Sequence, residues 1–283
     1  MSLYPDIVVR NVRYATAGQP ASDGAGVRMM RIIGTSGLDH LDPFLLFDVF
    51  RSDDPDDYIA GFPPHPHRGF ETVTYMFAGQ MRHRDNAGHE GVIRPGGVQW
   101  MTAGRGIVHS EMPEQEEGLM WGTQLWVNLP ASDKMTSPAY HEYAADRIPV
   151  EVRDGDVRLA VVAGTTRLGT QGPVRNRPTD PHYFDVRLPS GRVFAEPVPE
   201  SHNAFVFVVQ GAVDVGGTRV GEGHLAVLGD GTRVEAESKT AECRFLLVAA
   251  RALKEPVARG GPFVMNTQDE LRRAFLDYQT GRF

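Results

Sequence analysis

The sequence predicts an all-β protein made of two fused barrels or sandwiches. Its 31 glycines and 20 prolines are spread along 283 residues, and short runs rich in Val, Ile, Phe and Thr lie between them. This pattern is typical of many short strands joined by turns. The length is comfortable for two domains that each bury their own core. Helix signals are scarce before the C-terminus.

Strand-like runs occur in both halves of the chain, and each is followed closely by glycine or proline. The clearest are residues 71–77, 122–129, 156–163 and 204–209. Residues 70–79 and 202–211 can also be laid over one another, strand on strand and glycine on glycine, at a spacing of 132 positions. We interpret this echo as duplication of one barrel. The polar, proline-bounded stretch 130–138 then predicts domains of residues 1–135 and 136–283.

One amphipathic helix is expected at about residues 268–279, within the second domain. Thr267 and Glu270 form a capping-box pattern before it, and Gly281 stands where a C-terminal cap belongs. Apolar residues recur inside it with helical spacing, at Leu271, Ala274, Phe275 and Tyr278. Such a stripe should dock on a barrel.

Composition narrows the setting of the protein. The chain has 29 basic and 36 acidic residues, a formal charge of −7, which opposes direct binding to nucleic acid or anionic lipid. The N-terminus lacks a signal-peptide pattern, and no apolar run is long enough to span a bilayer. The single cysteine, Cys243, lies in an apolar run that predicts a buried strand and favours a reducing compartment. We therefore expect a cytoplasmic protein without membrane contact.

Two short motifs indicate a metal site. His65-Pro66-His67 places two imidazoles at i and i+2, which project from the same face of an extended backbone. His109-Ser110-Glu111 repeats this spacing after a glycine-rich bend at residues 103–106. Either motif alone is more typical of ordinary surface or hydrogen-bonded side chains. Together they supply four ligands that can converge on one ion.

Three imidazole nitrogens and one carboxylate suit a divalent transition metal, with one or two positions left for water, substrate or O₂. Fe(II) is the first choice. Manganese, nickel, copper and zinc remain open, because affinity for such a site follows the metal series and not the function.

Glu71 competes for a place at the metal. It lies six residues after His65, so it should face inward if the strand continues without a break. It could ligate, act as a base, or orient a histidine from outside the ligand set, and we favour the last role. The other histidines are expected to have no part in the site. His83 and His89 lie in a charged segment that predicts solvation, whereas the rest have no partner in sequence: His40, His141, His182, His202 and His224.

Large apolar residues near these motifs are candidates for the walls of a dry pocket that would suit an aromatic substrate. For each of them taken singly, an ordinary barrel core is the more common explanation. They are Phe44, Phe47, Phe62, Trp100, Met101 and Met120.

The chain resembles the pirin family of the cupin superfamily from about residue 5 to the C-terminus. Long, ordered segments that include the proposed ligands carry this resemblance: residues 42–48, 64–75, 97–113, 124–130 and 261–266. The resemblance implies a bicupin, two jelly-roll-type barrels with one iron in the N-terminal barrel. It assigns the three-His, one-Glu iron site to His65, His67, His109 and Glu111, and so supports Glu111 over Glu71. Residues 199–203 lack a His-x-His, so the C-terminal barrel is expected to be metal-free.

The resemblance also implies an activity. Bacterial pirin-like proteins are similar to quercetin 2,3-dioxygenases, so a flavonol-like aromatic and O₂ are the expected partners. In this interpretation Glu111 or Glu71 accepts the proton of the flavonol hydroxyl. The alternative is an iron-dependent, redox-responsive protein that binds a transcription factor or metabolic enzyme. A cupin isomerase or hydrolase using another metal is a third possibility. The aromatic and methionine-rich surroundings and the lack of clustered arginines and lysines near the ligands argue against a sugar phosphate substrate, although Arg68 and Arg105 keep that substrate class open.

Overall fold

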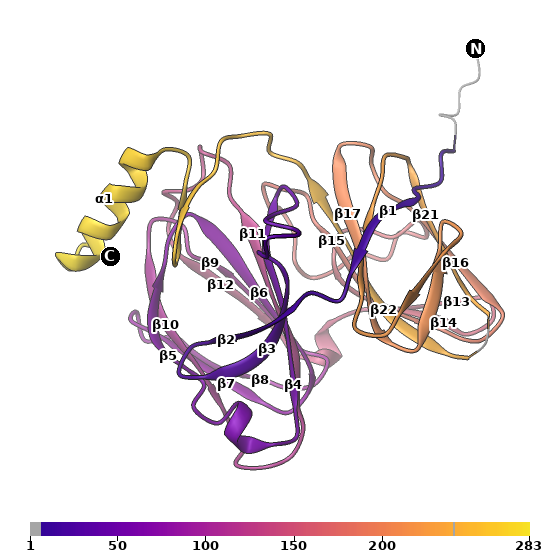
Figure 1. The fold of residues 1–283 in the computed structure, drawn as a ribbon, viewed down its shortest axis with the longest axis horizontal. Coiled ribbons are helices and arrows are strands. Elements are labelled where there is room, and N and C mark those ends of the chain that lie inside the picture. Colours follow the sequence, from indigo (N-terminus) through magenta and orange to yellow (C-terminus); the bar gives the residue numbers. More distant parts are fainter. Residues whose placement is uncertain (1–6, 240) are drawn as a thin grey trace. The chain divides into compact units, whose positions relative to one another are not determined.

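The structure is a computed structural model that describes residues 7–239 and 241–283. Within these residues it contains 24 strands, one α-helix and two short 3₁₀ helices, η1 (Pro55–Asp57) and η2 (Ala145–Arg147) (Figure 1). The prediction of an all-β fold with one C-terminal helix is confirmed.

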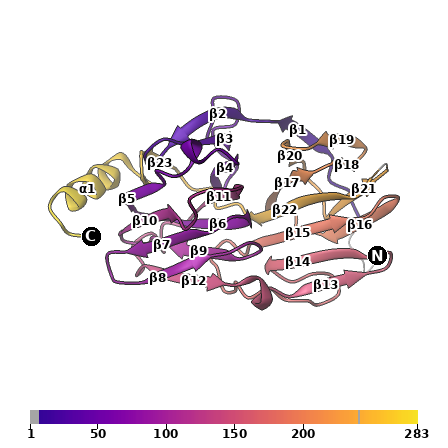
Figure 2. The same ribbon diagram turned by 90° about the horizontal axis from the view of Figure 1, so that it is seen from below.

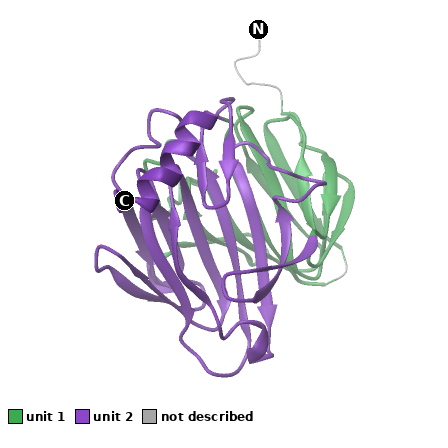
Figure 3. Ribbon diagram, turned by 60° about the vertical axis from the view of Figure 1, so that its left-hand side comes forward, with its two compact units in different colours: residues 1–18, 148–252 green, residues 19–147, 253–283 purple. Residues whose placement is uncertain are grey.

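The strands form two compact units (Figure 3). The first barrel comprises residues 19–147 and 253–283, and the second comprises residues 148–252 with the described part of residues 1–18. This division differs from the predicted one. The final segment of the chain belongs to the first barrel and not to the second, and the first strand of the chain belongs to the second barrel.

The first barrel combines a seven-stranded sheet with a four-stranded sheet. The larger sheet contains, in spatial order, β12 (Ala139–Tyr143), β9 (Val98–Thr102), β6 (Phe70–Ala78), β11 (Met120–Asn128), β4 (Phe44–Ser52), β3 (Val27–Ile33) and β2 (Gln19–Asp23). The smaller sheet contains β5 (Phe62–His67), β10 (Ile107–Pro113), β7 (Met81–Asp85) and β8 (Glu90–Ile93).

The second barrel has the same pair of sheets. Its larger sheet contains β1 (Val12–Thr16), β20 (Leu225–Leu228), β17 (His202–Gln210), β22 (Cys243–Arg251), β15 (His182–Leu188), β14 (Val157–Ala163) and β13 (Val150–Arg153). Several of these strands lie side by side in Figure 2. Its smaller sheet contains β16 (Arg192–Pro197), β21 (Arg233–Ser238), β18 (Ala212–Val215) and β19 (Thr218–Gly221).

The two strand orders match position by position. Strands β2 to β11 of the first barrel correspond to β13 to β22 of the second. The edge place next to β9 is filled by β12, which follows β11 in the chain, whereas the place next to β20 is filled by β1 from the other end of the sequence. The segments 70–79 and 202–211 that echo one another in sequence form the equivalent strands β6 and β17, as a duplication predicts.

The C-terminal segment is tied to the first barrel by named contacts. The Asp42 carboxylate accepts hydrogen bonds from the Leu253 and Lys254 amides, 3.1 and 2.7 Å long. The hairpin of β23 (Ala258–Gly260) and β24 (Phe263–Met265) follows. Within the same barrel the buried Lys134 Nζ donates to the Val264 carbonyl, at 3.0 Å. The predicted boundary relied on the polar composition of residues 130–138. Contacts between residues far apart in sequence are not visible in composition, so the last segment was assigned to the second domain.

Helix α1 (Gln268–Gln279) forms where it was predicted, and both hydrogen bonds of the Thr267–Glu270 capping box are present. Thr280 is the C-cap, and Gly281 after it has a φ of +67°. Leu271 and Ala274 bury their side chains among residues of β23 and β24. The helix therefore docks on the hairpin of the first barrel.

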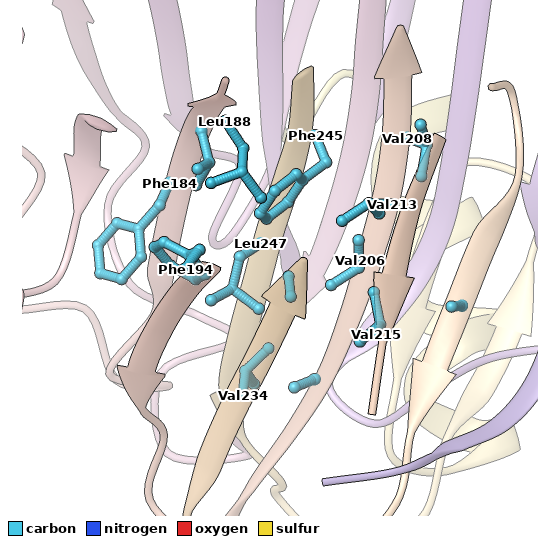
Figure 4. Close-up of a cluster of buried hydrophobic side chains, with 14 of the residues drawn as sticks. Phe184, Leu188, Phe194, Val206, Val208, Val213, Val215, Val234, Phe245 and Leu247 are labelled. Carbon is cyan, nitrogen blue, oxygen red and sulfur yellow. The ribbon is translucent and has the colours of Figure 1, made fainter. Parts of the chain in front are cut away.

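The interiors of the barrels differ. The second barrel is filled by a large apolar cluster that includes Phe184, Val206 and Leu247 (Figure 4). The first barrel has a smaller, methionine-rich cluster that includes Met29 and Met76. Its remaining interior is partly hollow.

Two further expectations can be checked here. Cys243 is buried at the start of β22, and burial raises the pKa of its thiol. No helix among the described residues is long and apolar enough to cross a membrane.

Candidate metal centre

Strand β5 carries the first pair of predicted ligands. It contains three prolines, which a strand tolerates here because β5 is at the edge of its sheet and need not donate hydrogen bonds on its outer side. The prolines also restrict the backbone around both histidines. His65 and His67 share one face of the strand, as their spacing predicts.

A sharp change of direction follows His67. Gly69 has a φ of +89°, and a Cβ atom there would lie 1.9 Å from the Val264 carbonyl oxygen, so only glycine fits. The chain then enters β6, which belongs to the larger sheet. The strand bearing His65 and His67 therefore ends before Glu71.

The second pair of predicted ligands, His109 and Glu111, follows a similar bend in the chain. Gly104 has a φ of +51°, and a Cβ atom there would lie 2.2 Å from the Thr136 carbonyl oxygen. The chain passes from β9 of the larger sheet into β10 of the smaller one, as the glycine-rich segment predicted. His109 and Glu111 are buried on β10 while Ser110 between them is partly exposed. His109 lies directly opposite His65 in the sheet.

Three histidines meet inside the first barrel. The ring centres of His65 and His67 are 4.7 Å apart, those of His65 and His109 are 4.4 Å apart, and those of His67 and His109 are 5.1 Å apart. One nitrogen from each ring lies within 4.8 Å of the other two. Among the described residues, these three histidines form the group whose nitrogen atoms lie close enough together to coordinate one metal ion.

The hydrogen bonds of these rings fit a metal ion. The buried Nδ1 of His67 and both ring nitrogens of His109 have no hydrogen-bond partner in the protein. His65 Nδ1 donates to the Pro63 carbonyl, at 2.9 Å, which leaves the lone pair of its Nε2 available to a metal. Buried nitrogens without partners are costly unless a ligand satisfies them.

The protonation of the buried rings also suits a cation. Burial lowers the pKa of His67 well below its ordinary value, and the neighbouring His65 lowers it further. Burial likewise lowers the pKa of His109, with smaller contributions from His67, His65 and His83. Both rings are therefore neutral at neutral pH, which is the form that binds metals.

Glu111 lies beside this cluster but not within it. It follows the β-bulge between His109 and Glu111, and it lies opposite Phe62 of β5. Its carboxylate oxygens are 2.9 Å from Thr74 Oγ1 and 3.1 Å from Gln124 Nε2. Thr74 and Gln124 therefore fix the carboxylate on the wall of the cavity described below. Glu111 as a fourth ligand remains a prediction.

Glu71 is placed differently from its expected orientation. Thr74 of β6 lines the cavity, so Glu71, an odd number of positions away, projects from the opposite face of the strand. Its Oε1 accepts a hydrogen bond of 2.7 Å from Thr102 Oγ1. The inward orientation depended on one uninterrupted strand from His65 to Glu71, and the turn at Gly69 breaks that alternation.

His83 is another departure from the sequence interpretation. It is buried on β7, opposite Glu111 on β10, and its Nε2 contacts the Glu142 carboxylate. His89 is mostly exposed, as expected, and bonds to Asp85 at 2.8 Å. Charged neighbours in the sequence suggested a loop at His83, but they occupy the outward positions of a strand.

His182 and His202 of the second barrel also have partners that sequence did not indicate. Their ring centres are 5.5 Å apart, on the distant segments β15 and β17. Burial lowers the pKa of His182 to about 4. No third ligand joins this pair among the described residues.

A cavity of about 400 Å³ adjoins the histidine cluster on the side of His65 and His67. His65, His67 and Glu111 lie on its wall. Its apolar lining comprises Met29, Leu46, Phe50, Phe62, Met81, Trp126 and Pro262. Its other polar lining residues are Asp23, Arg31, Asp48, Thr74, Gln124 and Arg259. The volume is large enough for a small aromatic molecule.

Of the wall residues expected from sequence, Phe62 lines the cavity. Met101 and Met120 belong to apolar clusters of the first barrel, whereas Phe44, Phe47 and Trp100 are buried elsewhere in its sheet. Sequence reasoning missed Trp126, whose ring centre is 5.2 Å from that of His67. Gln124 and Trp126 are two positions apart on β11, so they share one face of the strand, and this spacing could have indicated that Trp126 points inward. No local signal could have indicated Arg259, which arrives from the end of the chain.

Two cupin barrels with a three-histidine cluster inside one of them define a bicupin with a candidate metal site. Residues 26–127 match Pirin, and residues 183–283 match the Pirin C-terminal cupin domain. The chain belongs to the pirin family, as the motifs predicted.

Its relatives cover nearly its full length. It is 54% identical over 275 residues to a pirin-like protein of Caulobacter vibrioides, covering 97% of this chain and 99% of that protein. It is 46% identical to a Pseudomonas aeruginosa protein whose provisional name is quercetin 2,3-dioxygenase, covering 96% and 97% of the two chains. The crystal structure of quercetin 2,3-dioxygenase from Acinetobacter baumannii is similar with a TM-score of 0.89 and 33% identity, covering 98% of this chain and 99% of that one.

Proposed function

We propose that this protein is a metal-dependent dioxygenase that cleaves a flavonol with O₂, and that its metal is Fe(II). The observation that carries the proposal is the three-histidine cluster next to a cavity whose apolar lining residues are mostly aromatic side chains and methionines. The names of the Pseudomonas and Acinetobacter relatives support the same reaction class. The single buried cysteine is compatible with the cytoplasm as the place of action.

His65, His67 and His109 would hold the metal, with Glu111 as the fourth ligand. Imidazole and carboxylate donors suit Fe(II), and a four-ligand set leaves positions for substrate and O₂. When bound, the metal would supply Lewis acidity toward the flavonol 3-hydroxyl oxygen and a site for O₂.

The cavity would orient the flavonol rings. Trp126 already packs against both His67 and Phe70, with ring centres 5.2 and 4.3 Å apart. A flat substrate can lie along this wall with Phe50 and Phe62 around it. The apolar residues of the wall, which include Phe50, Phe62 and Trp126, would keep water away from the electron-rich enolate and so protect it from reprotonation.

Glu111, as a loosely held ligand, is the proposed base for the flavonol hydroxyl. Thr74 Oγ1 is 2.9 Å from Glu111 Oε1 and 2.7 Å from Gln124 Oε1, but it has only one proton for these two acceptors. When that proton is donated to Gln124, Glu111 Oε1 is left able to accept a proton from the substrate. The orientation of Glu71 on the opposite face of β6 supports Glu111 and not Glu71 in this role.

The test is anaerobic reconstitution with Fe(II), followed by measurement of O₂ uptake and loss of quercetin absorbance. We expect His109→Leu to abolish metal binding and turnover together. Glu111→Gln should retain the three histidines and lose at least about tenfold in turnover, within the usual contribution of a general base. His224→Ala, which changes an exposed histidine of the second barrel, is the control and should be unaffected. Full metal loading without O₂ consumption would contradict the proposal.

A metal-responsive binding protein is the second candidate. Arg68 follows His67 directly, and its Nη1 forms an ion pair of 2.9 Å with Asp277 of α1. Metal binding at His67 could thus alter a helix on the protein surface. Fe(II) loading that changes amide exchange in α1, without turnover of quercetin, would favour this function over the dioxygenase.

A further inference from the structure

Two arginines line the cavity, and only one of them has a carboxylate partner. Arg31 of β3 donates to Asp48 at 2.9 and 2.7 Å and to Asp23 at 3.0 Å. Among the described residues, no carboxylate lies within ion-pair distance of Arg259 of β23. Of the three acidic residues on the cavity wall, Asp23 and Asp48 are engaged by Arg31, and Glu111 accepts hydrogen bonds from Thr74 and Gln124.

Arg259 is nevertheless held in place. Its Nη1 donates to the Leu45 carbonyl, at 2.9 Å, and its guanidinium carbon lies 5.0 Å from the Trp126 ring centre. Burial lowers the pKa of Arg259 from its ordinary value, but an arginine stays protonated at neutral pH. Asp39, Asp48 and Asp23 favour its charged form, but each acts from beyond ion-pair distance. The Leu45 carbonyl takes one of the five N–H donors of the guanidinium, so the face toward the cavity can still bind a carboxylate directly.

Arg259 lies on the same cavity as the candidate metal centre, so one ligand could contact both. Trp126 lies next to both, because its ring packs against the Arg259 guanidinium and is T-shaped to the His67 ring. All three residues line the same cavity. A flat ligand resting on Trp126 can therefore present one end to the histidines and the other to the guanidinium.

We propose that the ligand selected by this cavity is an aromatic hydroxy compound with a carboxylate at its far end, and that Arg259 binds the carboxylate. This inference rests on the proposed function for the role of the hydroxyl end, and it narrows the substrate class from neutral flavonols to anionic hydroxyaromatics. The planar guanidinium suits a carboxylate because it can donate two parallel hydrogen bonds.

A set of three matched probes tests the proposal in the metal-loaded protein and in the metal-free protein. The probes are 6-hydroxy-2-naphthoate, its methyl ester and 2-naphthol, which share the ring and hydroxyl but differ in the charged group. Affinities are measured by calorimetry or by naphthol fluorescence. We expect the naphthoate to bind about tenfold or more tightly than the ester and the naphthol, a preference of the size that one charge-assisted contact supplies.

Arg259→Gln should reduce that preference to about one while changing the affinity for 2-naphthol little, and Arg259→Lys should restore part of it. The control is Arg28→Gln, which makes the same charge change at an arginine of β3 whose side chain is 76% exposed and pairs with Asp57. It should keep the full preference.

Two outcomes would overturn the inference. The wild-type protein could bind the naphthoate no better than its ester, which requires no variant to fold. Arg259→Gln could instead weaken all three probes equally, as expected if Arg259 only supports Trp126 and Leu45. The test is separate from turnover. A preference for the carboxylate without O₂ consumption would refute the dioxygenase function but support the proposed ligand class. Quercetin turnover without that preference would support the dioxygenase function and refute the ligand class.

Discussion

The two barrels share a strand order but have opposite interiors. Across β9, β6, β11, β4 and β3 of the first barrel, directly opposed residues form a polar row: Gln99, Thr74, Gln124, Asp48 and Arg31. The matching row across β20, β17, β22, β15 and β14 of the second barrel is apolar: Ala226, Val206, Leu247, Phe184 and Val161. Val206 follows Thr74 by 132 positions, the same spacing as the echo in the sequence.

The smaller sheets differ in the same way. In the first barrel His109 lies opposite His65, whereas in the second Ala236 lies opposite Phe194 on the corresponding strands. The strand order of the fold therefore tolerates either a hollow polar interior or a filled apolar one. The strand order fixes where side chains are placed, and the identity of those side chains decides whether a barrel contains a binding cavity or a packed core.

The largest effect is expected from exchanging a residue of the apolar row for its polar counterpart. Leu247→Gln should lower the free energy of unfolding by about 3–5 kcal/mol, because it removes apolar packing and buries an amide without partners. Denaturant unfolding followed by circular dichroism measures this. Val193→Gln, at an exposed position of β16, should change stability by less than about 0.5 kcal/mol. A comparable loss in both variants would show that the filled interior is not what stabilises the second barrel.

A smaller effect is expected from the buried cation of each barrel. Lys134 Nζ donates to Gly69 O at 2.8 Å, and Arg10 of the second barrel donates to Pro199 O at 2.7 Å. Burial lowers the pKa of Lys134 from 10.5 to about 8. The folded protein thus binds fewer protons than the unfolded chain between pH 8 and 10.5, and stability should rise with pH in that window by up to about 3 kcal/mol.

Stability measured from pH 7 to 10.5 checks this expectation. Lys134→Met should remove the rise, whereas Arg10→Met should leave it in place because arginine does not titrate there. The assignment would be refuted if the stability of the wild type rose no more between pH 8 and 10.5 than that of Lys134→Met.

The smallest effect concerns Gln99, at one end of the polar row. Its side chain is fully buried, and neither amide atom has a hydrogen-bond partner in the protein. Gln99→Met keeps the volume and removes the unsatisfied polar atoms, so we expect a gain of about 1–2 kcal/mol in thermal or denaturant unfolding. A loss of similar size would instead indicate a hydrogen bond from Gln99 to ordered water.

Sequence predicted those features that depend on local spacing. The i, i+2 spacing placed His65 and His67 on one face, and the glycine-rich bend brought His109 to them, as the structure confirms. The capping box at Thr267 and Glu270 predicted the start of α1 correctly. These features needed only the two-residue period of strands and the hydrogen-bonding habits of helix ends.

Features that depend on contacts distant in sequence were not predictable. The orientation of Glu71 depended on how Gly69 passes the chain between sheets, and the barrel to which α1 belongs depended on the contacts of Asp42 and Lys134. Arg259 reaches the cavity from more than 100 residues beyond the ligand motifs. No local pattern marks such a residue, because its neighbours in sequence are not its neighbours in the fold.

The most direct test of the central claim is an anaerobic calorimetric titration of the metal-free protein with Fe(II). The claim is that the first barrel alone holds a metal through its histidines. It predicts one ion per chain, loss of that ion in His109→Leu, and unchanged binding in His182→Ala. Two ions per chain, or a single ion that survives His109→Leu and is lost with His182→Ala, would contradict it.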